Sequence, residues 1–186
     1  DIGANIGQFA IRTQALGFKG QIHSFEPMEN EFNLLKKLSN NNSQWFTYKK
    51  GIGTENEINK EFFVSDNSVS SSLLQVNLEH TNNAPESIQR KKSEINLISL
   101  GKALEVEANI KSNIPIFLKI DVQGYEVPIL KNFLFKDYLI PLILIEASFI
   151  SLYHDQEGFD KLVSILYNNN YNIVEIMDCF RSKNTL

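Results

Sequence analysis

The 186-residue sequence contains one cysteine, Cys179, and therefore no second thiol with which an internal disulfide could form. A disulfide-stapled scaffold is excluded, and the three histidines stand in no spacing with Cys179 or acids that is typical of a metal site. Glycine (9 residues) and proline (5 residues) are too scarce for a collagen-like or linker-rich chain. With 42% hydrophobic residues, the composition is that of a globular protein.

Long hydrophobic runs and an excess of positive charge are also absent. The most apolar stretch, residues 139–150, has twelve residues and contains Pro141 and Glu146, whereas a membrane span needs about 20 apolar residues. The net charge of −4 disfavours nucleic acid as a partner. No signal peptide opens the sequence, which starts on Asp1 rather than Met, so we expect further residues before it.

What the sequence does contain is an alternation of apolar and amphipathic segments. Apolar runs separated by amphipathic helices predict βαβ units with buried parallel strands. We therefore expect one α/β domain over residues 1–186, a doubly wound, mostly parallel, Rossmann-like sheet from which the strand preceding Asp1 is missing. The polar region 54–93 is expected to be an irregular excursion rather than a second domain. Helices are predicted at 6–16, 29–38, 126–135 and 160–167, and strands at 21–25, 45–50, 58–64, 94–100, 114–122, 139–147 and 171–177.

Four carboxylates stand where predicted strands end: Asp1, Glu26, Asp121 and Glu146. A single acid after a strand is usually a helix cap or a loop residue. Four acids at one edge of a sheet repel one another, however, and need a cationic or hydroxyl-rich partner. Because ligands of such sheets bind beyond the carboxyl ends of the strands, this edge is the candidate site.

The run DIGANIG at residues 1–7 precedes the first predicted helix, where glycine lets backbone N–H groups approach a ligand closely. The dinucleotide fingerprint, with glycine at its first, third and sixth positions, fails here, because Gly3 is followed by Asn5 and Gln8. Glu26 ends the next strand, where in nucleotide-binding folds an acid accepts both ribose hydroxyls. The alternative is that Glu26 complements the dipole of the following helix.

Three blocks in this order resemble the motifs of the FkbM family of S-adenosylmethionine-dependent methyltransferases: DIGANIG at 1–7, FEP at 25–27 and LKIDVQGYE at 118–126. The resemblance implies a class I methyltransferase fold and S-adenosyl-L-methionine as cofactor. It also implies that residues 70–72 belong to a serine segment of the family, and that Gly101 replaces an acid that is usual there. The cofactor-binding residues that it implies are Asp1, Gly3, Asn5, Gly7, Glu26 and Asp121.

Methyl transfer to a hydroxyl requires an aligned acceptor and a general base for the hydroxyl proton. Asp121 is the first candidate for the catalytic residue and Glu146 the second, and His154 follows the strand that carries Glu146. Asp121 acts either as the base or as an electrostatic and positioning group. The resemblance implies O-methylation of a hydroxyl on a sugar, glycolipid or secondary metabolite, so a small-molecule or glycan acceptor is the expected partner.

Two other functions stay open. An NAD-type oxidoreductase is disfavoured by the failed glycine fingerprint. A non-catalytic Rossmann-like binding module is supported by Gly101 in place of the usual acid. The unpaired cysteine and the usual compartment of the cofactor favour a cytoplasmic location.

Overall fold

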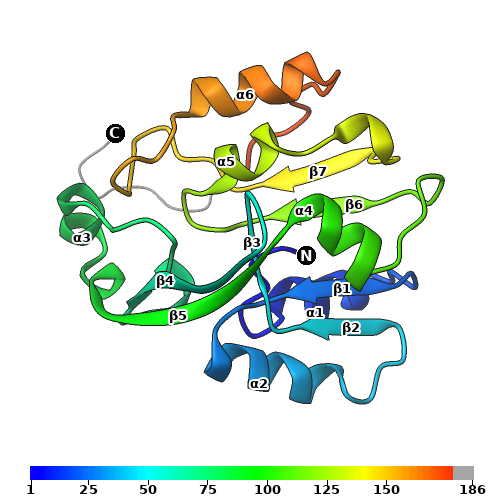
Figure 1. Ribbon diagram of the computed structural model, residues 1–186, viewed down its shortest axis with the longest axis horizontal. Coiled ribbons are helices and arrows are strands. Elements are labelled where there is room, and N and C mark those ends of the chain that lie inside the picture. The colour runs from blue at the N-terminus through cyan, green and yellow to red at the C-terminus, as the bar shows by residue number, and fades with distance from the viewer. Residues whose placement is uncertain (178–186) are drawn as a thin grey trace.

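The computed structural model of the protein describes residues 1–177, and Figure 1 shows how its elements are arranged. The strands are β1 Ile22–Phe25, β2 Trp45–Tyr48, β3 Gly51–Gly53, β4 Glu57–Ser65, β5 Gln89–Ser99, β6 Phe117–Ile120 and β7 Leu142–Ile145. The α-helices are α1 Gln8–Ala15, α2 Glu29–Ser39, α3 Leu78–Asn83, α4 Leu100–Lys102, α5 Glu126–Lys131 and α6 Phe159–Asn168. Single turns of other helix types are η1 Ser68–Ser70, η2 Pro85–Ser87, η3 Ala103–Glu107 and η4 Phe135–Asp137.

The main sheet is parallel and has the N-terminal segment at its centre. β1 pairs with β2, and β6 pairs with β7, both in parallel register. Ile2 forms parallel bridges to Phe25 at the end of β1 and to Ile120 at the end of β6. The spatial order is therefore β2, β1, Ile2, β6, β7, and the carboxyl ends of the strands share one edge. The protein is a mixed α/β structure with parallel strand pairs, as the sequence predicts.

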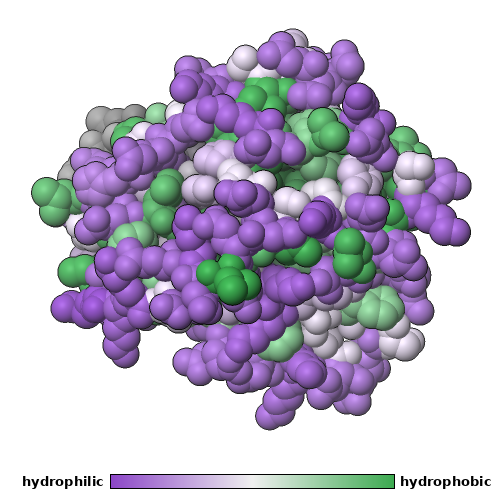
Figure 2. Space-filling model, in the orientation of Figure 1, coloured by the Kyte–Doolittle hydropathy of each residue, from purple (hydrophilic) through white to green (hydrophobic). Residues whose placement is uncertain are grey.

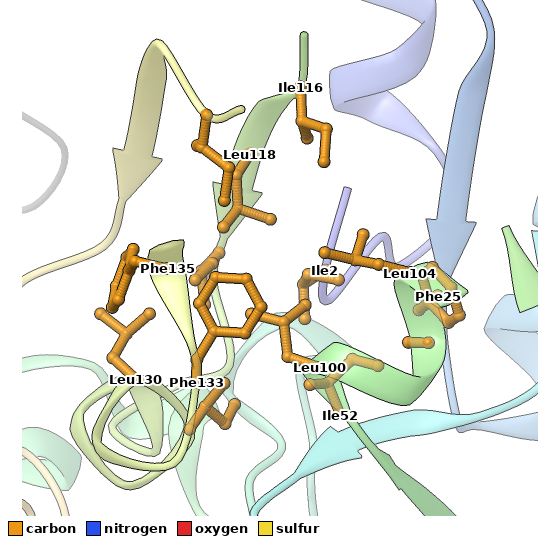
Figure 3. Close-up of a cluster of buried hydrophobic side chains, with 14 of the residues drawn as sticks. Ile2, Phe25, Ile52, Leu100, Leu104, Ile116, Leu118, Leu130, Phe133 and Phe135 are labelled. Atoms are coloured by element: carbon orange, nitrogen blue, oxygen red, sulfur yellow. The ribbon is translucent and has the colours of Figure 1, made fainter. Parts of the chain in front are cut away.

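Alternation along the strands divides the core between the two faces of this sheet. On one face, Ile22 and Trp45 pack with apolar residues of α1 and α2. On the other face, Ile2, Phe25 and Leu118 belong to a larger cluster to which α4, α5 and α6 contribute (Figure 3). Helices thus pack against both faces of the sheet, and the two apolar clusters fix the position of its strands.

The region between residues 54 and 93 is more regular than expected. β4 and β5 form an antiparallel ribbon, and β3 pairs with β5 in parallel. β5 begins at Gln89, five residues before the expected start, because the polar part of the strand is held across the ribbon. There the Lys92 ammonium lies 5.0 Å from the centre of the Phe63 ring and 2.9 Å from Glu61. In Figure 1 the arrowheads of β1, β6 and β7 point toward this ribbon.

Two sequence predictions near the C-terminus are wrong. Residues 171–177, expected as the last strand, pair with no strand within residues 1–177, and Val174 is 83% exposed. Apolar alternation favours a strand, but a strand forms only where a neighbouring edge receives its hydrogen bonds. The helix expected to reach residue 135 ends at Lys131, because Phe133 and Phe135 turn into the core instead. Cys179 lies outside the described residues.

The surface in Figure 2 is mostly hydrophilic, and its apolar side chains form small separate patches. The longest helix, α2, has 11 residues, about half of what a bilayer requires. Among residues 1–177, no helix combines the length and the apolarity needed to cross a membrane.

Candidate active site

A cavity of about 470 Å³ opens at the carboxyl ends of β1 and β6, between the main sheet and the β4–β5 ribbon. The three sequence blocks meet there, since residues from each of them line it. The lining residues used below are Gly3, Asn5, Gln8, Phe9, Arg12, Glu26, Met28, Ile52, Phe62, Ser68, Ile95, Leu97, Lys119, Asp121 and Gln123. A cavity therefore lies at the carboxyl edge of the sheet, where the sequence predicts the candidate site.

The glycine loop is shaped by close packing against the end of β6. Gly3 has a φ of +70°, and a Cβ at this position would lie 1.8 Å from the carbonyl oxygen of Asp121. Only glycine fits so close to a backbone atom in the left-handed region. Gly7 also has a positive φ, and a Cβ there would lie 2.9 Å from the Trp45 ring. The two glycines thus let the loop turn against β6 and against the core, while Gly7 itself does not line the cavity.

Glu26 is held at the end of β1 with both carboxylate oxygens fixed. Oε2 accepts the backbone N–H of Asn5 at 2.8 Å, and Oε1 accepts that of Met28 at 2.9 Å. The residue is 5% exposed, and burial raises its pKa to about 7 despite these two hydrogen bonds. An ionised carboxylate has about four lone-pair positions, so each oxygen can still accept one hydroxyl from the cavity.

Lys119 lies in the third motif block but was not among the candidate site residues. Its ammonium donates to the carbonyl oxygens of Gly3 at 2.8 Å and Ile2 at 3.2 Å. It also lies 3.5 Å from Asp1 Oδ1 and 3.4 Å from Asp121 Oδ2. The sequence did contain a signal for this role: Lys119 is a lysine inside an apolar strand, and it lies two residues before Asp121 and therefore on the same face of the sheet. Lys119 joins the glycine loop to β6 and balances two of the four carboxylates.

Asp121 and Glu146 are brought together by Gln123. The amide nitrogen of Gln123 donates to Asp121 Oδ1 at 2.9 Å and also to Glu146 Oε2. Its amide oxygen accepts the Tyr153 hydroxyl at 2.8 Å. Burial, followed by the charge of Asp121, holds the pKa of Glu146 well above its ordinary value. Glu146 therefore retains its proton near neutral pH.

Residues 68–72, which include the serine segment, lie beside the cavity, and Ser68, Val69 and Ser71 line it. Ser68 Oγ accepts from the Asn5 side chain at 3.0 Å, and Ser72 Oγ donates to the Gln123 carbonyl oxygen at 2.7 Å. The Ser70 carbonyl oxygen accepts the Tyr153 hydroxyl at 3.1 Å. This segment therefore bridges the glycine loop and the block at 118–126, which sequence spacing alone did not indicate.

The structure separates the predicted site residues into two groups. Gly3, Asn5, Glu26 and Asp121 line the cavity, whereas Glu146 does not line it and accepts a hydrogen bond from the lining residue Gln123. Asp1 does not line it: its side chain is 1% exposed and accepts a hydrogen bond from Ser24. Two further residues that the sequence singled out, His154 and Gly101, are absent from the lining. Among residues 1–177, no group of three or more His, Cys, Asp or Glu is arranged to hold a metal ion.

The buried carboxyl groups predict that stability falls as pH rises. Burial raises the pKa of Glu26 and of Glu126 to about 7, from 4.5 in the ordinary state. Between these values the folded protein binds more protons than the unfolded chain, so the free energy of unfolding decreases with pH. One pKa unit corresponds to about 1.4 kcal/mol, and we expect a loss of a few kcal/mol between pH 5 and pH 8. Urea midpoints at the two pH values measure it.

The Glu126→Gln variant provides the control for this prediction. Glu126 accepts the N–H of Val122 at 2.9 Å through Oε1, which an amide can also do. The variant should therefore keep its fold and show a smaller loss of stability between pH 5 and pH 8. A urea midpoint of the original protein that is constant or rises over this range would contradict the assignment.

Comparison with known proteins gives a family. No curated protein matches the chain significantly. One solved structure that matches is the crystal structure of Methyltransferase FkbM from Methylobacillus flagellatus KT at 2.20 Å resolution, with 18% sequence identity and a TM-score of 0.40. The match covers 71% of this chain and 27% of that chain. Residues 1–173 match the sequence model of the Methyltransferase FkbM domain. Because this match extends over nearly the whole sequence, the chain belongs to the FkbM methyltransferase domain family.

Proposed function

We propose that this domain transfers a methyl group from S-adenosyl-L-methionine to a hydroxyl group of a sugar, glycolipid or secondary metabolite. The observation that carries the proposal is Glu26, a buried carboxylate at the end of β1 that lines the cavity and accepts one backbone N–H on each oxygen. A carboxylate with one free acceptor position on each oxygen suits the two adjacent hydroxyls of a ribose. The doubly wound class I architecture, one domain over residues 1–186 and a cytoplasmic location are parts of the same proposal.

The other lining residues fit the remaining parts of the cofactor. Met28, Ile52 and Phe62 form an apolar wall beyond Glu26 on which a purine can pack, and Ile95 and Leu97 extend it. Gly3 removes any side chain from the loop between Glu26 and Asp121. Asp121 supplies negative charge at the β6 end of the cavity, where a sulfonium is stabilised. When bound, the cofactor supplies an electrophilic methyl group.

Asp121 is the proposed catalytic residue. It lines the cavity, its side chain is 38% exposed, and Lys119 and Gln123 fix its two oxygens. A carboxylate held in this way can receive the proton of an attacking hydroxyl while keeping its position. Glu146, the second candidate, sits behind Gln123 and accepts its amide hydrogen. In this proposal Glu146 is protonated, and Asp121 faces the acceptor.

The two alternatives are less well supported. An NAD-type oxidoreductase would need a glycine-rich loop for the pyrophosphate. This chain does not have the required pattern, since Asn5 and Gln8 occupy two of the three glycine positions. Gly101 favoured a non-catalytic module, but Gly101 does not line the cavity and its carbonyl oxygen accepts the Tyr138 hydroxyl at 3.0 Å. Glycine in place of the usual acid at position 101 therefore removes no side chain from the cavity lining.

Calorimetric titration with S-adenosylhomocysteine tests the cofactor. We expect micromolar binding, no binding of NADH, and a Kd that is roughly 10–100-fold higher in Glu26→Ala, because one or two charged hydrogen bonds are lost. Glu29→Ala is the matched control, since its carboxylate is 62% exposed and pairs with Lys49. Unchanged affinity in Glu26→Ala removes Glu26 from the site. Binding of NADH, or of neither compound, overturns the proposed function.

A further inference from the structure

The cavity is lined by two cations that differ in how they are bound. Lys119 is 8% exposed, and its ammonium faces two carbonyl oxygens and the carboxylates of Asp1 and Asp121. Arg12, in α1, also lines the cavity, but within residues 1–177 its guanidinium has no hydrogen bond and no ion pair. Arg12 is thus the one lining cation of the described chain that is free for an anionic ligand group.

Arg12 lies on the face of α1 that lines the cavity. Gln8, Phe9 and Arg12 all line the cavity and lie on neighbouring positions of one helix face, because residues three and four apart are adjacent. The Phe9 ring contacts the ring of Phe117, at the start of β6, edge to face with 5.8 Å between centroids, so this face of α1 packs against β6. Glu26 and Met28 line the cavity from the β1 side instead. The cavity thus has a carboxylate at the end of β1, a second one at the end of β6, and a guanidinium on α1.

We propose that Arg12 binds the carboxylate of the amino-acid portion of the cofactor. The inference rests on the proposed function: with the ribose at Glu26 and the sulfur facing Asp121, the amino-acid portion extends toward α1. A carboxylate there needs a cation, and Lys119 has already used its three donors. A guanidinium offers a planar pair of donors that matches a carboxylate. In this assignment Arg12 contributes to the affinity for the cofactor and does not bind the methyl acceptor.

Ligands that differ in the amino-acid portion test this assignment without an acceptor. S-adenosylhomocysteine carries the carboxylate, 5′-methylthioadenosine lacks the whole amino-acid portion, and decarboxylated S-adenosylmethionine keeps the amine and lacks only the carboxylate. Calorimetry on Arg12→Ala should show a Kd for S-adenosylhomocysteine that is about tenfold higher, since a charge-assisted pair is lost. The Kd values for the other two ligands should change less than about twofold. Arg12→Lys, which keeps the charge, should recover part of the affinity.

Arg90→Ala is the matched control, because Arg90 is paired with Asp66 at 2.8 Å and does not line this cavity. Its affinities for all three ligands should equal those of the unchanged protein. Binding of 5′-methylthioadenosine by Arg12→Ala shows that the nucleoside part of the site is folded. Equal weakening of all three ligands, or no weakening of any, overturns the assignment and leaves the proposed function standing. If the unchanged protein binds none of the three, the proposed function and the inference both fail.

Discussion

Gly3→Ala is expected to destabilise the protein by at least about 3 kcal/mol, a large part of the 5–15 kcal/mol that is typical of a folded domain. Two effects add. The backbone at Gly3 has a φ of +70°, which costs a residue with a Cβ about 1–2 kcal/mol. The Cβ would also lie 1.8 Å from the Asp121 carbonyl oxygen, so β6 or the loop must move. Urea denaturation measures the loss, and binding of S-adenosylhomocysteine should be lost with it.

Gly17→Ala separates the two effects. Gly17 has a φ of +95°, but nothing lies within 4 Å of a Cβ there. We expect a loss of only about 1 kcal/mol, which is the conformational part alone. Equal losses in the two variants would mean that the loop yields freely at Asp121, and the close packing of the glycine loop on β6 would then not be what fixes the site.

Asp121→Asn is expected to lower methyl transfer by about 10²–10⁴-fold while the Kd for S-adenosylhomocysteine changes less than about threefold. The amide is nearly isosteric and can keep one hydrogen bond within the Gln123 network. It cannot receive the hydroxyl proton, however, and it removes a negative charge from the β6 end of the cavity. Methyl transfer is measured as incorporation of a radiolabelled methyl group into a panel of sugars, glycolipids and other hydroxyl-bearing metabolites. The Kd for S-adenosylhomocysteine is measured separately by calorimetry.

Asp137→Asn is the control for Asp121→Asn, since Asp137 is exposed in η4 and does not line the cavity. It should transfer methyl groups at the original rate. Full activity in Asp121→Asn would remove Asp121 from the catalytic step and leave Glu146 as the remaining candidate. Loss of product binding together with activity would instead assign Asp121 to cofactor binding alone.

The local periodicity of the chain was enough to predict most elements of the main sheet. The strand expected at 21–25 is β1, and the helix expected at 29–38 is α2, which runs one residue further. Both follow from contacts within a few residues, where apolar spacing and flanking glycine or proline decide the outcome. The last strand, expected at 171–177, failed for the opposite reason, since a strand depends on a partner edge that its own sequence does not specify.

By itself, the sequence determined the family, the three motif blocks and the edge of the sheet at which they meet. Parallel strands bring their carboxyl ends together, so the order of apolar runs alone assigns Glu26 and Asp121 to one site. The tertiary structure decided which acids face the cavity. Asp1 was an equal candidate, but its carboxylate is buried, accepts a hydrogen bond from Ser24 and lies near the Lys119 ammonium.

Only the tertiary structure revealed the residues that hold the site in place. Tyr153 reaches Gln123 across 30 residues of sequence and Ser72 reaches it across 51, and neither contact follows from a spacing. Arg12 became a candidate because it lines the cavity and its guanidinium has no partner within the part of the chain that the structure describes. Periodicity and motifs report local geometry, whereas burial, charge pairing and side-chain contacts depend on which distant segments pack together.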